Sequence, residues 1–213
     1  MITNPDDISF TYHKKTNTLT ASSDQPLLIN NARLGYKITY FLLDFSHAPG
    51  HTFYEGSYFF AEDTSGRKPR EIKQILRARD NAYFGSRMHF VRSLWANNLK
   101  KEGFGLYNKD NTPVETKAIV VMHDQERFIA LKGSVFIVYN RQKSDVKFRE
   151  NTSEALIAYN GYIGPNSLWS GYISTQRVKE LLPFEFEPAN HIVQTDNFAT
   201  QAPASQKAAD KGG

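Results

Sequence analysis

The alternation in residues 34–45, LGYKITYFLLDF, constrains the fold more than any other stretch of the chain. Apolar side chains recur there at every second position, the period that returns side chains to the same face of a β-strand. Four of them share one face: Tyr36, Ile38, Tyr40 and Leu42. The opposite face begins polar and becomes apolar from Phe41 onward. We therefore expect this segment to enter the core as the central strand of a sheet.

Weaker patterns of the same kind occur on both sides of this segment. Residues 8–21 alternate around a polar turn at 14–17 and predict a β-hairpin, and PLLI (26–29) predicts a further strand. The last third of the chain contains more candidate strands: AIVVM (118–122) and RFIAL (127–131) around a polar turn, VFIVY (135–139), and EALIAYNGYIG (154–164). Short strands joined by such turns predict a mainly antiparallel sheet.

Residues 67–101 contain helical patterns instead. Pro69 fits the first turn of one helix, because that turn needs no amide donor. From residue 78 onward, apolar residues form two adjacent stripes at helical spacing, and Gly103 is placed to end this second helix. The stripes contain Phe84, Met88, Val91, Trp95 and Leu99, and beside them Tyr83, Phe90 and Leu94. We interpret Phe84, Phe90 and Trp95 as structural residues that pack against the sheet.

Arg87 projects between the two apolar stripes of the second helix. A buried guanidinium without a partner is costly, so its charged end must either reach solvent or meet a carboxylate from the sheet. We favour the buried pair, which makes Arg87 a structural residue.

These patterns predict an α+β fold, with a mainly antiparallel β-sheet, a helical insertion at about 68–101 and a short C-terminal helix. The last helix is QRVKELL (176–182), with Ser174 or Thr175 as its N-cap and Pro183 just beyond its end. Residues 1–188 are expected to form a single domain. Residues 189–213 are small, polar and unpatterned, and predict a disordered tail whose removal leaves stability unchanged.

The positive charge of the chain is concentrated in one segment. The net charge is +4, but residues 67–101 alone contain ten basic and two acidic side chains. The candidate basic binding surface consists of Arg70, Lys73, Arg77, Arg79 and Arg92. Cations interleaved with aromatic rings are the two ingredients of a single-strand nucleic-acid binder. We keep this function as an alternative only, because the rings fall on the presumed core side and the cations are scattered around the helices.

The sequence contains no recognisable catalytic or metal-binding motif. The absence of cysteine excludes disulfides and thiolate chemistry. His47 and His51 enclose a Pro-Gly pair, so they cannot form the helical histidine pair of a zinc protease. A G-x-S-x-G element is missing, and His89 and His123 have no identifiable partner for acid–base work. We expect no enzyme activity, no metal and no cofactor, and an uncharacterised hydrolase is the second alternative.

Several blocks of the chain, in order, resemble one bacterial family. The most specific are NNARLGYKITY (30–40) and GSRMHFVRSL (85–94), and YEGSYFF (54–60) and RVKELLPFEFEP (177–188) accompany them. Together they are similar to the C-terminal region of the carboxypeptidase-like regulatory domain-containing proteins of Bacteroidetes-type bacteria. The similarity covers roughly residues 4–188.

This resemblance implies a place in the cell envelope. Such proteins begin with a signal peptide and a small β-sandwich, neither of which precedes the matching blocks here, so the chain looks like a truncated member. It is expected to be periplasmic or outer-membrane associated as part of a longer exported precursor, and cytoplasmic if Met1 is the true start.

The resemblance carries no catalytic residues to this chain, since none are established for the region matched. It implies a non-catalytic binding or scaffolding module whose partners are envelope proteins or acidic envelope surfaces. No apolar run approaches the roughly 18 residues of a membrane-spanning helix, so no membrane span is expected.

Overall fold

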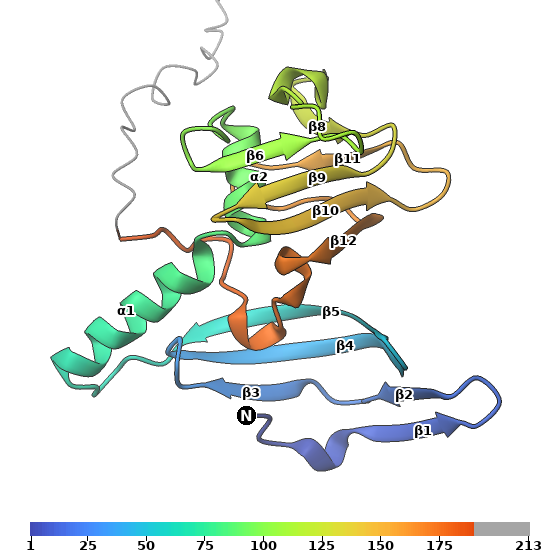
Figure 1. Ribbon diagram of the computed structural model, residues 1–213. Helices are drawn as coiled ribbons and strands as arrows, with labels where there is room; N and C mark the ends of the chain where they lie inside the picture. The colour runs from blue at the N-terminus through green and yellow to red at the C-terminus, as the bar shows by residue number, and fades with distance from the viewer. Residues whose placement is uncertain (190–213) are drawn as a thin grey trace, which may run out of the picture.

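The structure is a computed structural model that describes residues 1–189. Its regular structure is mainly antiparallel β-sheet, arranged as a lower and an upper part (Figure 1). The lower part is one five-stranded sheet, preceded by a 3-10 turn, η1 (Pro5–Asp7). Its strands are β1 (Ser9–His13), β2 (Thr18–Ser22), β3 (Leu27–Asn31), β4 (Tyr36–Ala48) and β5 (His51–Glu62).

β4 is the central strand of this sheet, as its alternation predicts. β3 and β2 pair in succession with one edge of β4, and β5 pairs with the other edge. The side chains of Tyr36, Ile38 and Tyr40 on the predicted inner face are all buried. The predicted hairpin at residues 8–21 is confirmed as the β1–β2 pair.

The upper part contains two smaller antiparallel sheets (Figure 1). One has the order β12-β10-β9-β6 and the other the order β11-β8-β7. The strands are β6 (Phe104–Tyr107), β7 (Val120–His123), β8 (Glu126–Ala130), β9 (Val135–Tyr139), β10 (Gln142–Phe148), β11 (Glu154–Ile157) and β12 (Ser167–Gly171), with a 3-10 turn, η2 (Thr116–Ala118), before β7. The predicted hairpin of residues 118–131 and the strand at 135–139 are confirmed.

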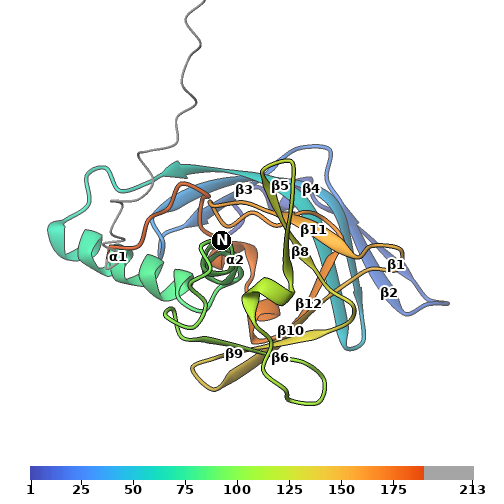
Figure 2. The ribbon, with the colours of Figure 1, turned by 90° about the horizontal axis from the view of Figure 1, so that it is seen from above.

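Two α-helices follow β5 in the chain. α1 spans Pro69–Tyr83 and begins at its proline, as predicted, and α2 spans Arg87–Trp95. Figure 2 shows α1 extending to one side of the sheets. The buried side chains of α2, in contrast, pack in one core with strands of both upper sheets.

A sharp break separates the two helices, so the prediction of one continuous helix from residue 78 to its end at Gly103 is wrong. Gly85 lies in the break with φ +80°, and a Cβ on it would stand 2.7 Å from the Tyr139 ring. Only glycine combines this backbone conformation with so close an approach. Ser86 then begins α2 as its N-cap, because its hydroxyl accepts a hydrogen bond from the His89 amide at 3.0 Å.

The predicted C-terminal α-helix is also wrong. The chain forms two 3-10 turns in that region, η3 (Tyr172–Thr175) and η4 (Val178–Glu180). The hydroxyls of Ser174 and Thr175 donate backward to carbonyls of the preceding turn and cap no helix. A short Ser/Thr segment that satisfies its own backbone in this way competes with helix formation.

Two groups of buried side chains form the core. The larger one lies in the upper part, where Phe90 and Val91 of α2 have no exposed surface. The smaller one joins the lower sheet to α1 and to the C-terminal segment: Leu34, Tyr36, Ile38, Tyr83, Leu182 and Phe186. The end of the described chain therefore returns to pack on the first sheet.

The predicted tail falls almost entirely outside the described residues, since it begins at residue 189. Within residues 1–189, neither helix is long and apolar enough to span a membrane.

We expect the buried tyrosines to make the protein sensitive to alkali. Burial raises the pKa of Tyr40 to about 12, and it also raises the pKa of Tyr36, Tyr58 and Tyr83. The unfolded chain ionises near pH 10, so the stabilisation is complete below pH 10 and is lost as the pH rises toward 12. Tyr40 alone should account for roughly 2 to 3 kcal/mol of that loss. Denaturant melts between pH 8 and 12 measure it, with Tyr40→Phe as the control whose pH dependence should be shallower.

Candidate functional site

The candidate basic residues of the 67–101 segment do not form one surface. Arg70, Lys73 and Arg77 are exposed on α1. Arg79, on the buried side of the same helix, and Arg92, on α2, are engaged inside the fold. The structure therefore does not bring the five candidates together.

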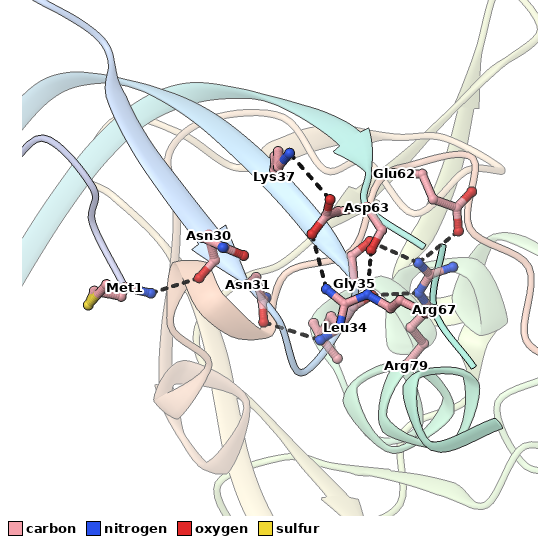
Figure 3. A network of polar contacts seen from close by, with 10 residues as sticks. All are labelled: Met1, Asn30, Asn31, Leu34, Gly35, Lys37, Glu62, Asp63, Arg67 and Arg79. Atoms are coloured by element: carbon pink, nitrogen blue, oxygen red, sulfur yellow. Dashed lines mark hydrogen bonds and ion pairs between the residues drawn. The ribbon is translucent and has the colours of Figure 1, made fainter. Parts of the chain in front are cut away.

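Arg79 is a buried structural residue, so its assignment to the basic surface is wrong. Its guanidinium donates to the carbonyls of Leu34 at 2.8 Å and Gly35 at 3.2 Å, and it pairs with Glu62 at 2.9 Å (Figure 3). It also lies 4.1 Å from the centre of the Tyr36 ring. Arg79 thus ties α1 to the turn between β3 and β4 and to the end of β5.

A second ion pair beside it continues this network. Asp63 accepts from Arg67 at 3.0 Å and from Lys37 at 3.3 Å, and its amide donates to the Gly35 carbonyl at 2.8 Å (Figure 3). The hydrogen bonds from Arg67 and Lys37 hold the pKa of the Asp63 carboxyl below its usual value. The network is structural, because its polar groups satisfy one another.

Arg92 is likewise engaged within the fold, which corrects its assignment to the basic surface. It donates to the carbonyls of Asn160 and Phe184, both at 3.1 Å, and contacts Glu187 at 3.6 Å. Its role is to hold two connecting segments against α2.

Arg87 is exposed, so the prediction of a buried pair is wrong. The break at Gly85 makes Arg87 the first residue of α2 and removes it from the helical phase that the stripes predicted. Its amide donates to Gln176 Oε1 at 3.2 Å, whereas its guanidinium has no ion-pair partner among residues 1–189. Its side chain faces a cleft that sequence reasoning missed.

This cleft, with a volume of about 690 Å³, lies between β5, the start of α2 and the loop before β12. Its lining includes the run Phe53–Tyr58 of β5, residues Ser86–Met88 at the start of α2, and Gly161–Ser167. Residues Gln176 and Glu180–Leu182 close one side. The cleft therefore lies where the lower sheet, the helices and the upper part meet.

The cleft combines cationic and aromatic groups. Arg87 and Arg149 line it, and neither guanidinium is ion-paired within residues 1–189. Arg149 lies 5.7 Å from the centre of the Phe53 ring. Burial raises the pKa of Tyr58, and the nearby positive charge of Arg87 partly opposes that shift.

Two glutamates, Glu55 and Glu180, also line the cleft, and one of them is hydrogen-bonded to a neighbouring backbone amide. Glu180 accepts a hydrogen bond from the Arg177 amide at 3.1 Å, while Glu55 is an exposed residue of β5.

Gln176 links three of the elements that line the cleft. Its carbonyl accepts from Tyr54 at 3.0 Å, and its amide group donates to the Ala82 carbonyl and accepts from the Arg87 amide, both at 3.2 Å. One side chain and its own carbonyl thus connect β5, α1 and α2. The cleft has a defined shape because these three elements cannot separate without losing those bonds.

The two histidines considered for acid–base work have carboxylate partners that sequence reasoning did not identify. His89 is 1% exposed, and its Nδ1 accepts from the Gly85 amide at 3.1 Å. Its Nε2 then carries the proton and donates to Glu102 at 3.3 Å. Both nitrogens are engaged in the interior, so His89 locks the break between the helices. His123 and Glu154 form an exposed pair, 3.1 Å apart, on β7 and β11.

The residues expected to be structural differ in burial. Phe90 is 0% exposed, whereas Phe84 and Trp95 are half-buried. The Trp95 ring lies at the edge of the upper core, with the Arg127 guanidinium 4.3 Å from its centre.

No group of three or more potential metal ligands occurs among residues 1–189. The chain matches no protein-family model, no curated protein and no solved structure.

Proposed function

We propose that the protein is a non-catalytic binding module of the cell envelope and that the cleft along β5 is its binding site. The observation that carries this proposal is the combination in one cleft of several aromatic rings with two arginines, Arg87 and Arg149, that have no ion-pair partner among the described residues. A concave site of this size with a few charged groups among apolar ones is typical of binding sites in proteins.

The chemistry of the lining favours binding over catalysis. The arginines can bind anionic groups in a bidentate manner, and the rings offer apolar surface. His89 is turned into the interior, so it supplies no base to this cleft. For these reasons we do not propose a hydrolase.

The envelope location rests on the resemblance of blocks such as GSRMHFVRSL (85–94), which contributes Ser86, Arg87 and Met88 to the cleft. Partners in that location are envelope proteins or acidic envelope surfaces. We further propose that residues 1–188 form one domain with the helical segment as an insertion. The bonds of Gln176 to β5, α1 and α2 support this proposal.

The nucleic-acid alternative has less support. Its exposed cations Lys73 and Arg77 lie on α1, while two of the rings needed for stacking, Tyr83 and Phe90, are buried. Base stacking requires accessible ring faces.

A binding panel separates the two functions. The probes are a peptide array, envelope glycans, lipopolysaccharide vesicles and single-stranded DNA, each tested against the wild type and two double variants. Arg87→Gln with Arg149→Gln should weaken binding of at least one probe about tenfold or more, because each lost charged hydrogen bond costs roughly 1.5 to 3 kcal/mol.

The matched control is Lys73→Gln with Arg77→Gln, which removes the same charge from α1 and should change that binding less than about twofold. If only the α1 variant lost affinity, and only for DNA, the nucleic-acid function would replace the one proposed.

A further inference from the structure

The backbone of β5 faces the cleft. In the described part of the chain β5 pairs with β4 alone, so its second edge has no strand partner. Six consecutive residues, Phe53–Tyr58, line the cleft. Successive side chains of a strand point to opposite faces, so an unbroken run of lining residues indicates that the edge of β5, with its main-chain donors and acceptors, borders the cavity, which also reaches Leu43 of β4.

The same sheet covers the β3 part of its other edge, whereas the outer edge of β1 is exposed and has no strand partner in residues 1–189. The N-terminal residues run along β3, where the Thr3 amide donates to the Leu28 carbonyl at 2.7 Å and the Asn30 amide donates to the Met1 carbonyl at 2.9 Å. The Asn4 side chain accepts from the Leu28 amide at 2.7 Å. Natural sheets usually protect an exposed edge in this way, so an edge left open inside a cleft points to a strand supplied from outside.

We infer that the cleft binds an extended segment of a partner protein, which adds to β5 as a further strand. This inference rests on the proposed function and names the ligand class of the same site. Main-chain hydrogen bonds to the β5 edge supply the recognition that is independent of sequence, as in other cases of strand addition.

The dimensions of the cleft fit such a segment. Six residues of a strand extend over about 20 Å, which is the usual length of a strand in a sheet. A cavity of about 690 Å³ along that edge accommodates a short extended peptide and not a folded element.

The side chains around the cleft determine which peptide fits. Arg87, at the start of α2, and Arg149, beside the Phe53 ring, favour a peptide with acidic side chains. Glu55 on β5 itself is an exposed charge that rejects an acidic residue next to it. The expected ligand therefore alternates acidic side chains directed at the arginines with apolar side chains directed at the rings.

The test uses an array of synthetic decapeptides and the strongest binder that it yields. That peptide is then N-methylated at every second residue, in two versions that differ only in which set of residues is modified. Strand addition predicts that one version loses binding at least tenfold and the other less than about threefold, because only one set of amides faces β5. It also predicts that alternate amides within residues 53–58 gain about tenfold or more protection from hydrogen exchange.

The remaining outcomes separate this inference from the proposed function. Equal effects of the two methylated versions, without protection of β5, overturn strand addition, as does an array without any binder. If a glycan or vesicle of the panel still binds in a manner that needs Arg87 and Arg149, the cleft remains the binding site. A peptide whose binding does not depend on Arg87 or Arg149, and which does not protect the β5 amides from exchange, overturns both the proposed function and strand addition.

Discussion

Replacing Arg79 with methionine should lower the free energy of unfolding by roughly 2 to 5 kcal/mol. The change keeps most of the apolar stem and removes the donor to the Leu34 carbonyl, whereas the Gly35 carbonyl keeps its hydrogen bond from the Asp63 amide. A buried acceptor left without a partner costs roughly 1 to 3 kcal/mol, and the contact with the Tyr36 ring adds about 0.5 to 2 kcal/mol. The partner Glu62 is 58% exposed, so it regains water and adds little.

Arg77→Met is the matched control for this prediction. Arg77 lies on the same helix, two residues away, and its side chain is exposed. Its replacement should change the free energy of unfolding by less than about 0.5 kcal/mol. Urea melts of the three proteins measure both values, and equal losses in the two variants would show that Arg79 is no more important to the fold than a surface arginine.

The burial of Arg79 and the exposure of Arg87 show where helical periodicity fails to predict which side chains are buried. Helical periodicity assumes an unbroken helix, and by that assumption Arg87 belongs to the buried side. Gly85 and Ser86 interrupt the helix, so the phase begins again at Arg87. A glycine followed by a serine is a combination that ends one helix and caps the next, and this signal is present in the sequence.

Strands were predictable where their own side chains are apolar, either in alternation or in an unbroken run such as VFIVY (135–139). The central strand β4 follows from its alternation, because burial of one face imposes that pattern. β10, QKSDVKF, is different: its buried residues are Ser144 and Val146, and charged side chains occur between and beside them. Such a strand is fixed by its two neighbours, β9 and β12, and not by its own composition.

The cleft could not be predicted from local patterns at all. Its walls come from segments far apart in the chain, and the bond between Tyr54 and the Gln176 carbonyl joins residues separated by 122 positions. Only tertiary packing brings Arg87 and Arg149 to one cavity. What the sequence did contain is the composition of the lining, since β5 supplies several aromatic residues, and the two arginines occur at positions 87 and 149.

Phe90→Ala should be the most damaging truncation of a single aromatic side chain on α2, at roughly 3 to 5 kcal/mol. Phe90 is 0% exposed, and its ring centre lies 5.4 Å from that of Phe104 on β6 and 5.9 Å from that of Trp169 on β12. Its removal would leave a cavity at the point where α2 packs against the four-stranded sheet. A rigid interior fills such a cavity only in part, so both the lost burial and the empty volume contribute.

Trp95→Ala supplies the comparison, because tryptophan is the larger residue and lies on the same helix. Trp95 is half-buried, with Tyr159 at 6.2 Å and Arg127 at 4.3 Å as its edge contacts. Partial burial reduces the expected loss to roughly 1 to 3 kcal/mol, below the value that a fully buried tryptophan at this position would have. Guanidinium chloride melts, fitted with one common denaturant slope, give the loss of unfolding free energy for both variants. If Trp95→Ala cost as much as Phe90→Ala, the packing centre of α2 would lie one turn later than Phe90, at the edge next to Arg127.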